Sequence, residues 1–316
     1  MRDQVRRLEQ ARQISRDRFG RRITFFLPGM FSLDGVSGKY PAISITGTNC
    51  ALNCNHCRGI LLHSMIPAEY PPLLIEKCLH LSEKGNHGVL ISGGCDKEGR
   101  LPWKDFTPAI EEIKEKTDLF VSVHSGFIDY TGALRLKEAG VDQALIDVIG
   151  DDETYLSICH VRAGVSWVLS SLESLNKAAL PVVPHIVCGI HNGKIKGEKR
   201  AVEMISRFDV EQVVIVSLMQ LPGADMPNVT TPPAEEIADI IVEARFRMPD
   251  IRISLGCARQ RGNTDIELLA IEAGVNRMAI PSEEAIKRAE DYGLEIKYQR
   301  TCCSVSKDFS GEKWKQ

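Results

Sequence analysis

The 316-residue sequence predicts an α/β fold, a (β/α)8 barrel of the TIM-barrel type, on two observations. Short β-branched or apolar runs alternate with helical patterns from about residue 42 onward, which is typical of parallel strands joined by crossover helices. Eight such units also fit the chain length that this barrel usually needs. Strands are expected at 42–47, 87–93, 119–124, 143–148, 182–188, 212–219, 251–256 and 276–280.

Helical periodicity and helix-end signals occupy the segments between these strands. Four apolar residues share one face of a helix expected before the seventh strand: Ile237, Ile240, Ile241 and Ala244. Thr264 and Glu267 form a capping-box pattern, and Gly274 is expected to end the helix that follows. The similar sequences EAGVD at 138–142 and EAGVN at 272–276 predict the same helix-to-strand corner twice, as stacked β/α units require.

The chain is expected to form one catalytic domain, because no low-complexity or Pro/Gly/Ser-rich linker divides it. Residues 40–293 are assigned to the barrel, 1–39 to an N-terminal helix and strand, and 294–316 to a tail that folds over the barrel mouth. Eight arginines in the first 22 residues are interrupted by acidic residues. A solvated amphipathic helix is the interpretation, and docking of an acidic partner stays an alternative.

The amino-acid composition argues against several functional classes of protein. The chain is 43% hydrophobic and 26% charged with a net charge of −3, so no basic surface for nucleic acid is expected. No apolar run reaches the roughly 18 residues of a membrane span, and the start lacks the apolar stretch of a signal peptide. We therefore expect a cytoplasmic protein in a reducing compartment despite its ten cysteines.

Three cysteines lie within eight residues of the segment SITGTNCALNCNHCRG: Cys50, Cys54 and Cys57. This Cys-x3-Cys-x2-Cys spacing lets one loop deliver three thiolates to a single iron–sulfur cluster. Without a fourth neighbouring thiol, one iron stays open to a small molecule. A structural zinc loop is the alternative, but it would need a second Cys or His pair that is not evident here.

The motif resembles that of the radical S-adenosylmethionine (radical SAM) enzymes, which have a ring before the last cysteine, here His56. The resemblance implies a 4Fe–4S cluster whose open iron chelates S-adenosylmethionine. It also implies an electron donor such as ferredoxin or flavodoxin, and cleavage to a 5′-deoxyadenosyl radical. In this interpretation Cys50, Cys54 and Cys57 are both the metal ligands and the catalytic residues.

Further segments resemble the parts of this family that hold S-adenosylmethionine. Ser92-Gly93-Gly94 lies where the family has Gly-Gly-Glu, whose backbone carbonyls receive the methionine amino group, although Cys95 replaces the acidic residue. Residues 189–193 resemble the adenine-side Gly-x-Ile-x-Gly motif, through Gly189 and Ile190, and Asp147 matches the ribose-binding region. Other polar residues near strand ends are candidates for ribose or substrate: Ser122, His124, Ser125 and Asp151. His124 is equally well interpreted as a core histidine, and His185 as structural.

More cysteines follow the strands than the motif requires. Cys95, Cys188 and Cys257 end the second, fifth and seventh strands and are expected to point into one cavity. With Cys302 and Cys303 of the tail, they are candidate ligands of a second iron–sulfur cluster. Two other cysteines fall on apolar helical faces and are interpreted as core thiols: Cys78 and Cys159.

The resemblance is more specific in the last third of the barrel. Residues 248–278 look like biotin synthase, with Cys257 at the position of an unusual arginine ligand to its auxiliary cluster and Cys188 near one of its cysteine ligands. Where biotin synthase has two further cysteine ligands, this chain has serine: Ser92 and Ser122. The likeness covers about residues 40–290.

The tail sequence TCCSV and the strand end Gly-Cys-Ala-Arg look most like one subunit of the split, archaeal-type lipoyl synthase. This resemblance implies insertion of sulfur at an unactivated carbon of an octanoyl chain carried on a lipoyl domain or H-protein. It also implies a partner radical SAM subunit. Two alternatives stay open: a biotin-synthase-like mutase without an auxiliary cluster, and a zinc-stabilised binding barrel.

Overall fold

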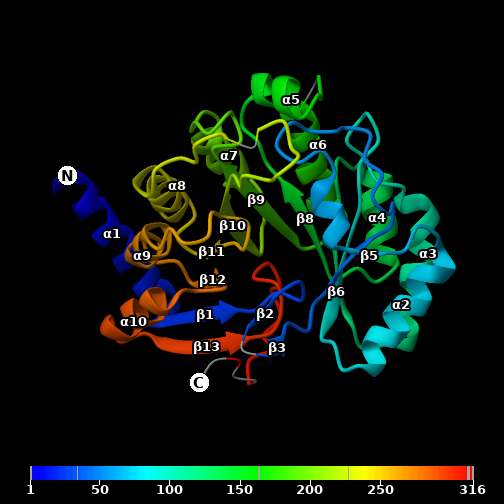
Figure 1. The fold of residues 1–316 in the computed structure, drawn as a ribbon, viewed down its shortest axis with the longest axis horizontal. Coiled ribbons are helices and arrows are strands. Elements are labelled where there is room, and N and C mark those ends of the chain that lie inside the picture. The colour runs from blue at the N-terminus through cyan, green and yellow to red at the C-terminus, as the bar shows by residue number, and fades with distance from the viewer. Residues whose placement is uncertain (1, 34, 163, 227, 312–313, 315–316) are drawn as a thin grey trace.

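The computed structural model describes residues 2–33, 35–162, 164–226, 228–311 and 314. Its main sheet is a curled half-barrel of eleven parallel strands in the order β13-β1-β12-β11-β10-β9-β8-β7-β6-β4-β5 (Figure 1). The predicted α/β class is therefore confirmed. The eight predicted strands correspond to β4 and β6 to β12, and consecutive members of this series are hydrogen-bonded neighbours.

The strands are short, as expected for a curled parallel sheet. Those of the main sheet are β1 (Arg22–Phe26), β4 (Ala42–Ser44), β5 (Ile66–Pro67), β6 (Gly88–Ser92), β7 (Phe120–His124), β8 (Gln143–Asp147), β9 (Val182–Cys188), β10 (Gln212–Ser217), β11 (Arg252–Leu255), β12 (Arg277–Ala279) and β13 (Glu295–Gln299). A separate antiparallel pair comprises β2 (Ser32–Leu33) and β3 (Val36–Ser37).

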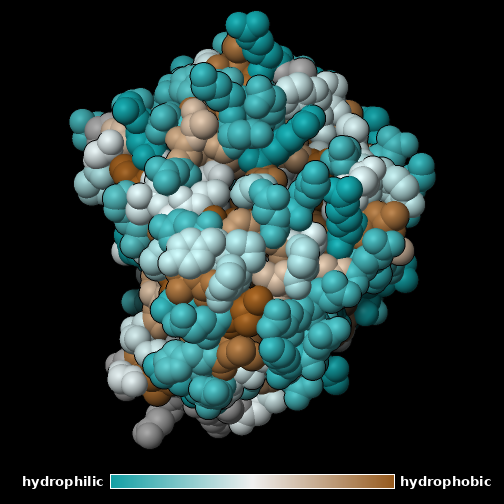
Figure 2. Space-filling model, turned by 90° about the vertical axis from the view of Figure 1, so that its right-hand side faces the viewer, coloured by the Kyte–Doolittle hydropathy of each residue, from teal (hydrophilic) through white to brown (hydrophobic). Residues whose placement is uncertain are grey.

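Helices cover the outer face of the sheet (Figure 1). They are α1 (Arg2–Phe19), α2 (Pro71–Glu83), α3 (Trp103–Lys116), α4 (Tyr130–Glu138), α5 (Asp152–Ile158), α6 (Gly164–Lys177), α7 (Glu198–Ile205), α8 (Ala234–Arg247), α9 (Asp265–Glu272) and α10 (Glu283–Asp291), with one 3-10 helix, η1 (Ile60–Ser64). Within the described part of the chain, no helix is long and apolar enough to cross a membrane. Hydrophilic residues dominate the face shown in Figure 2.

The half-barrel is open because β1 and β13 extend the sheet beyond β12. β1 pairs with β12 on one side and with β13 on the other, so β12 does not pair with β4. The strand read from ITFFLPG is thus a member of the main sheet. Its alternate residues contribute to different cores, with Phe25 in the sheet–helix core and Phe26 in the interior.

Side chains alternate between these two cores along each strand. In β9, Val182 and Ile186 belong to the large sheet–helix core, whereas Val183 faces the interior of the curled sheet. The interior core consists of the following buried residues: Phe26, Leu145, Val183, Val214, Val216, Ala279 and Cys303. Because β10 is buried along its whole length, its sequence QVVIVS reads as a continuous apolar run.

The predicted helix ends were partly correct. Gly274 follows α9 with a left-handed φ of 77°, as predicted, and the apolar face of α8 is buried. The predicted capping box is wrong, because the Thr264 side chain makes no capping hydrogen bond. The reason is that the Glu267 carboxylate is held by the buried Arg259 guanidinium and by the Ser282 N–H.

The C-terminal tail packs at the amino ends of the strands. Gln143 and Gln212, the first residues of β8 and β10, donate side-chain hydrogen bonds to Ser304 O. Arg277, the first residue of β12, donates to Val305 O. The tail therefore covers the end of the sheet opposite to the cysteine loop, and not the mouth expected from sequence. Hydrogen-bond donors at the strand starts satisfy its backbone carbonyls and so fix it there.

Candidate functional site

The loop after β4 carries the three motif cysteines at the carboxyl ends of the strands. Cys57 N–H and Arg58 N–H both donate to Cys54 O, at 2.9 and 2.8 Å, which turns the chain sharply inside the motif. Asn53 also adopts a left-handed φ of 47°, a conformation that asparagine tolerates. Cys50, Cys54 and Cys57 are all partly buried and form no disulfide.

Gly94 explains why this loop can lie so close to β6. A Cβ atom on Gly94 would be 2.0 Å from Asn49 O and 2.6 Å from Cys50 Cα, so any larger residue would displace the loop. Two hydrogen bonds hold the segments together: Gly94 N–H to Thr46 Oγ1 at 2.6 Å and Ala51 N–H to Cys95 O at 2.7 Å. The glycine is therefore a packing requirement of the cysteine loop.

We expect Gly94→Ala to reduce iron retention and to lower stability by about 1–3 kcal/mol, since the methyl group overlaps backbone atoms. Iron per chain after anaerobic reconstitution and the unfolding midpoint measure the two effects. Gly85→Ala is the control: Gly85 has a left-handed φ of 70° and open space around it, so its alanine variant adds backbone strain without overlapping the cysteine loop. Equal iron content in both variants would contradict this role for Gly94.

The motif cysteines line a cavity of about 300 Å³ at the carboxyl ends of the strands. Several of the residues predicted to contact the cofactor also line it: Ser92, Gly93, Gly94, Cys95, His124, Asp147 and Ile190. Gly189 is in a left-handed turn with a φ of 82°, and its N–H donates to Glu198 Oε1 at 2.8 Å. It shapes the turn that presents Ile190 to the cavity.

Three other polar residues that were candidates for binding ribose or substrate do not line the cavity. The Ser122 hydroxyl is fully buried, 2.5 Å from Tyr40 Oη, and is not among the cavity-lining residues. The Asp151 carboxylate accepts a hydrogen bond from Thr154 N–H and caps α5. Ser125 is likewise buried, and its hydroxyl donates to Gly126 O and Leu145 O. Local hydrogen bonds therefore occupy all three side chains.

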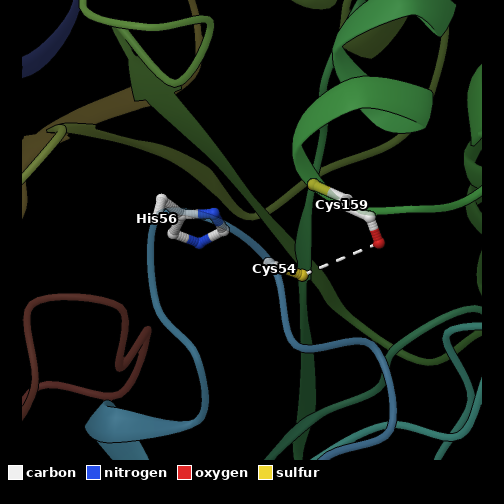
Figure 3. Close-up of side chains that lie close together, drawn as sticks. All are labelled: Cys54, His56 and Cys159. Atoms are coloured by element: carbon white, nitrogen blue, oxygen red, sulfur yellow. Dashed lines mark hydrogen bonds between the residues drawn. The ribbon is translucent and has the colours of Figure 1, made fainter. Parts of the chain in front are cut away.

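A fourth cysteine lies beside the cysteine loop. Cys159, next to the end of α5, faces Cys54 and His56, and the ligand atoms of the three residues lie within 4.8 Å of one another (Figure 3). The Cys54 thiol donates to Cys159 O at 3.8 Å, and Asn55 N–H donates to Ile158 O. Cys159 is buried in the core, as the sequence suggested, but its nearness to Cys54 was missed because 105 residues separate the pair.

The environment of Cys54, His56 and Cys159 shifts the pKa values of their side chains. Hydrogen bonding with Cys159 lowers the pKa of Cys54 and raises that of Cys159. Burial lowers the pKa of His56, whose Nδ1 is buried and makes no hydrogen bond with the described residues. The thiols of Cys50, Cys54 and Cys57 line one cavity, beside the buried Nδ1 of His56. This arrangement fits a bound iron–sulfur cluster and a small-molecule ligand.

A second polar group lines the interior of the sheet. His124 Nε2 lies 3.7 Å from Asp147 Oδ1, and the ligand atoms of His124, Asp147 and His185 all lie within 4.8 Å. Burial lowers the pKa of His185 to about 4, so its imidazole is neutral at pH 7. The structure thus joins His185, interpreted from sequence as structural, to the two candidate binding residues.

The remaining cysteines do not share one cavity, contrary to the sequence-based expectation. Cys188 is fully buried in the sheet–helix core, because His185 and Val187 take the inward positions of β9 and alternation directs Cys188 outward. Burial and the nearby Glu198 carboxylate raise the pKa of Cys188. Cys95 lies by the cysteine loop, where burial and Cys50 raise its pKa.

Cys257 and the two tail cysteines gather inside the curled sheet. Cys303 belongs to the interior core, with Cys257 and Cys302 packed against it. Ser304 Oγ donates to Cys302 Sγ at 3.1 Å, and a hydrogen bond from Cys303 lowers the pKa of Cys302 to about 6. Burial, followed by the charge of Cys302, raises the pKa of Cys257 to about 11. These three thiols form the interior cysteine group.

The part of the chain that carries the cysteine loop matches a known family model. Residues 44–198 match the family model described as the Radical SAM superfamily, so the chain contains a radical SAM domain. This match supports the iron–sulfur cluster that the cysteine spacing predicts. The family implies a 4Fe–4S cluster, S-adenosylmethionine and a reductant.

Among characterised relatives, the chain is similar to biotin synthases. That of Geotalea uraniireducens (strain Rf4) is 24% identical over 243 residues, covering 74% of this chain and 72% of the relative. That of Magnetococcus marinus (strain ATCC BAA-1437 / JCM 17883 / MC-1) is 24% identical over 265 residues, covering 78% and 80%. The predicted likeness to biotin synthase is confirmed, and the likeness to a lipoyl synthase subunit stays a prediction.

Solved structures share the fold. Methylornithine synthase superposes with a TM-score of 0.62 at 17% identity, covering 93% of this chain and 89% of that one. The FeFe-hydrogenase maturase HydG from Carboxydothermus hydrogenoformans gives 0.63 at 15% identity, covering 92% and 71%. At such identities the likeness establishes the fold alone, so the substrate must be argued from the site.

Proposed function

We propose that this radical SAM enzyme inserts sulfur at an unactivated C–H bond of a protein-bound octanoyl chain, as one subunit of a two-component lipoyl synthase. The observation that carries the proposal is the interior cysteine group: Cys257, Cys302 and Cys303. The biotin synthase relatives point to the same reaction class. An octanoylated lipoyl domain or H-protein is the proposed substrate, with a second radical SAM subunit and a ferredoxin or flavodoxin as partners.

Each group of residues has a separate role in this proposal. Cys50, Cys54 and Cys57 hold the first cluster, which with S-adenosylmethionine supplies the one-electron chemistry that activates C–H bonds. The Gly93-Gly94 backbone is open to the cavity and offers carbonyl oxygens to the methionine amino group. Ile190 offers an apolar contact to the adenine. Asp147 accepts hydrogen bonds from ribose hydroxyls.

A second iron–sulfur cluster, held by the interior cysteine group, is the proposed sulfide source. Cys257 at the end of β11 and Cys302 in the tail approach from opposite ends of the sheet and interact electrostatically. Cys302 and Cys303 are adjacent in sequence and cannot easily serve the same iron, so we assign Cys302 as the main tail ligand. Cys188 is withdrawn from the ligand set because it faces the helices.

Cys257→Ala is expected to spare S-adenosylmethionine cleavage and to eliminate the thiolated product. The assay incubates the enzyme anaerobically with an octanoylated lipoyl-domain peptide, a reductant and the candidate partner subunit, with mass spectrometry for added sulfur. Cys188→Ala is the matched control and should retain the product, because its thiol cannot reach the interior. Loss of product in both variants, or in neither, would contradict the assignment.

A rearranging radical SAM enzyme without a second cluster is the second candidate. The serines at positions 92 and 122 favour it, since they stand where biotin synthase has cluster ligands. Iron content separates the candidates: about eight iron atoms per chain for two cubanes, about four for one, and none for a zinc-stabilised barrel. If the octanoyl peptide gains no sulfur while another substrate is rearranged, the sulfur-insertion proposal is wrong.

A further inference from the structure

Two imidazoles and one carboxylate converge inside the sheet, and two of these residues line the same cavity as the motif cysteines. His124 and Asp147 end the neighbouring strands β7 and β8, and His185 lies in β9. One ligand atom of each lies within 4.8 Å of the other two. We propose that His124, Asp147 and His185 form a binding site for a divalent first-row transition-metal ion, separate from any iron–sulfur cluster.

The distances suit an ion better than a direct hydrogen bond. His124 Nε2 and Asp147 Oδ1 are 3.7 Å apart, which exceeds hydrogen-bond length. Two ligands about 2.1 Å from an ion at a tetrahedral angle lie about 3.4 Å apart. The gap between the two side chains is therefore close to the one that a shared cation would span.

The His185 ring is oriented as a ligand. Its Nδ1 lies 3.1 Å from Val183 O, so Nδ1–H donates to that carbonyl and Nε2 is left with a free lone pair. Metal-binding histidines are commonly fixed in this way by a backbone acceptor behind the ring. The His124 and His185 rings are 5.9 Å apart and tilted by 49°, so they do not stack against each other. A tilted pair leaves room for a shared ion.

Charge also favours a cation at this position. His124 is the only ion-pair partner within 4.0 Å that the described residues give Asp147. The described residues that line the cavity include neither lysine nor arginine. Asp147 therefore presents a carboxylate with no fixed cation beside it, on the wall of a cavity that can admit one.

The ligand set indicates the kind of ion and its use. Two imidazole nitrogens and one carboxylate, without thiolate, suit Fe²⁺, Co²⁺ or Zn²⁺, and three protein ligands leave further positions open. Because His124 and Asp147 share the cavity with the cluster cysteines, those positions would be available to an oxygen donor of the substrate. A hydrogen bond to ribose needs Asp147 alone and gives no reason for the two histidines. This inference goes beyond the proposed function: it reassigns the Asp147 carboxylate from the ribose hydroxyls to the ion, and in every other respect it is independent of that function.

The test uses the full chain with Cys50, Cys54, Cys57, Cys257 and Cys302 replaced by alanine, so that neither the cysteine loop nor the interior cysteine group competes for the ion. Metal-free protein is titrated anaerobically with Co²⁺ and followed by ligand-field absorption. We expect one Co²⁺ per chain without a thiolate charge-transfer band. Adding Asp147→Asn or His185→Gln should weaken binding about ten-fold or more.

His191→Gln in the same background is the matched control, since His191 is a nearby histidine bonded to Thr154 rather than to this group. It should bind Co²⁺ as the parent does, and bound ion should raise the unfolding midpoint only in proteins that keep the site. Unchanged Co²⁺ affinity in Asp147→Asn and His185→Gln, or binding with thiolate bands alone, would overturn the inference. In the latter case cobalt would be bound by the remaining cysteines.

Discussion

Replacing Cys50, Cys54 and Cys57 together with alanine is expected to abolish reductive cleavage of S-adenosylmethionine. The three thiols come from one sharply turned loop and line one cavity, so the triple variant removes the whole proposed ligand set of the radical cluster. The measurement is 5′-deoxyadenosine formed anaerobically with a strong reductant. Cys78→Ala is the control, because this core thiol on α2 is fully buried and far from the motif in sequence.

Two outcomes of this experiment carry separate information. Formation of 5′-deoxyadenosine at the parent rate by the triple variant would disprove the cluster assignment. Iron retained by the triple variant after reconstitution reports on the interior cysteine group. About half of the parent iron is expected if a second cubane is present, and an iron-free variant would show that there is none.

Arg259→Met is expected to lower the free energy of unfolding by about 3–5 kcal/mol, because it leaves a buried carboxylate without its cation. The Arg259 side chain is fully buried, and its Nη2 lies 2.7 Å from Glu267 Oε1 and 2.7 Å from Ala279 O. Its Nη1 also donates to Gly256 O at 2.5 Å. One guanidinium thus connects the end of β11, the start of α9 and the end of β12.

Denaturant unfolding of the metal-free protein measures this effect, with Arg207→Met as the control. Arg207 pairs with Glu203 one helical turn away on α7, but both side chains are exposed, so a change below about 1 kcal/mol is expected. The double variant Arg259→Met/Glu267→Gln should recover part of the loss, since no uncompensated charge remains. A single variant as stable as the control would contradict the prediction.

The arrangement around Arg259 also bears on Cys257, two residues earlier. Arg259 fixes the turn after β11 through Gly256 O, and Arg261 donates to Cys257 O at 2.8 Å. The sequence segment Gly-Cys-Ala-Arg therefore combines a candidate ligand with the residue that fixes its backbone. The position at a strand end and the resemblance to biotin synthase predicted the cysteine as a ligand, but the buried ion pair with Glu267 required the contact between α9 and the strand ends.

Sequence patterns determined the local features of this protein. The spacing of Cys50, Cys54 and Cys57 specifies a three-thiol loop because the whole motif fits within one turn of chain. Runs such as QVVIVS predicted buried parallel strands, since strands covered on both faces are apolar throughout. Gly274 ends α9 because its left-handed φ of 77° is costly for other residues. Each of these depends on contacts a few residues apart.

The alternation of side chains along a strand also bears on the direction of Cys188. Alternation along β9 places His185 and Val187 inward and thus Cys188 outward. A position at a strand end does not by itself place a thiol in the cavity, because only every second residue of a strand reaches the interior of a curled sheet.

Only the tertiary structure decided which distant segments meet. It brought Cys159 to Cys54 and His185 to Asp147, inserted β1 between β12 and β13, and carried the tail to the amino ends of the strands. Local spacing contains no information about these contacts, because they depend on the stagger of neighbouring strands and on hydrogen bonds between residues far apart in the chain. The sequence therefore determined the chemistry of the first cluster loop, whereas packing decided which of the other polar groups and thiols share a site.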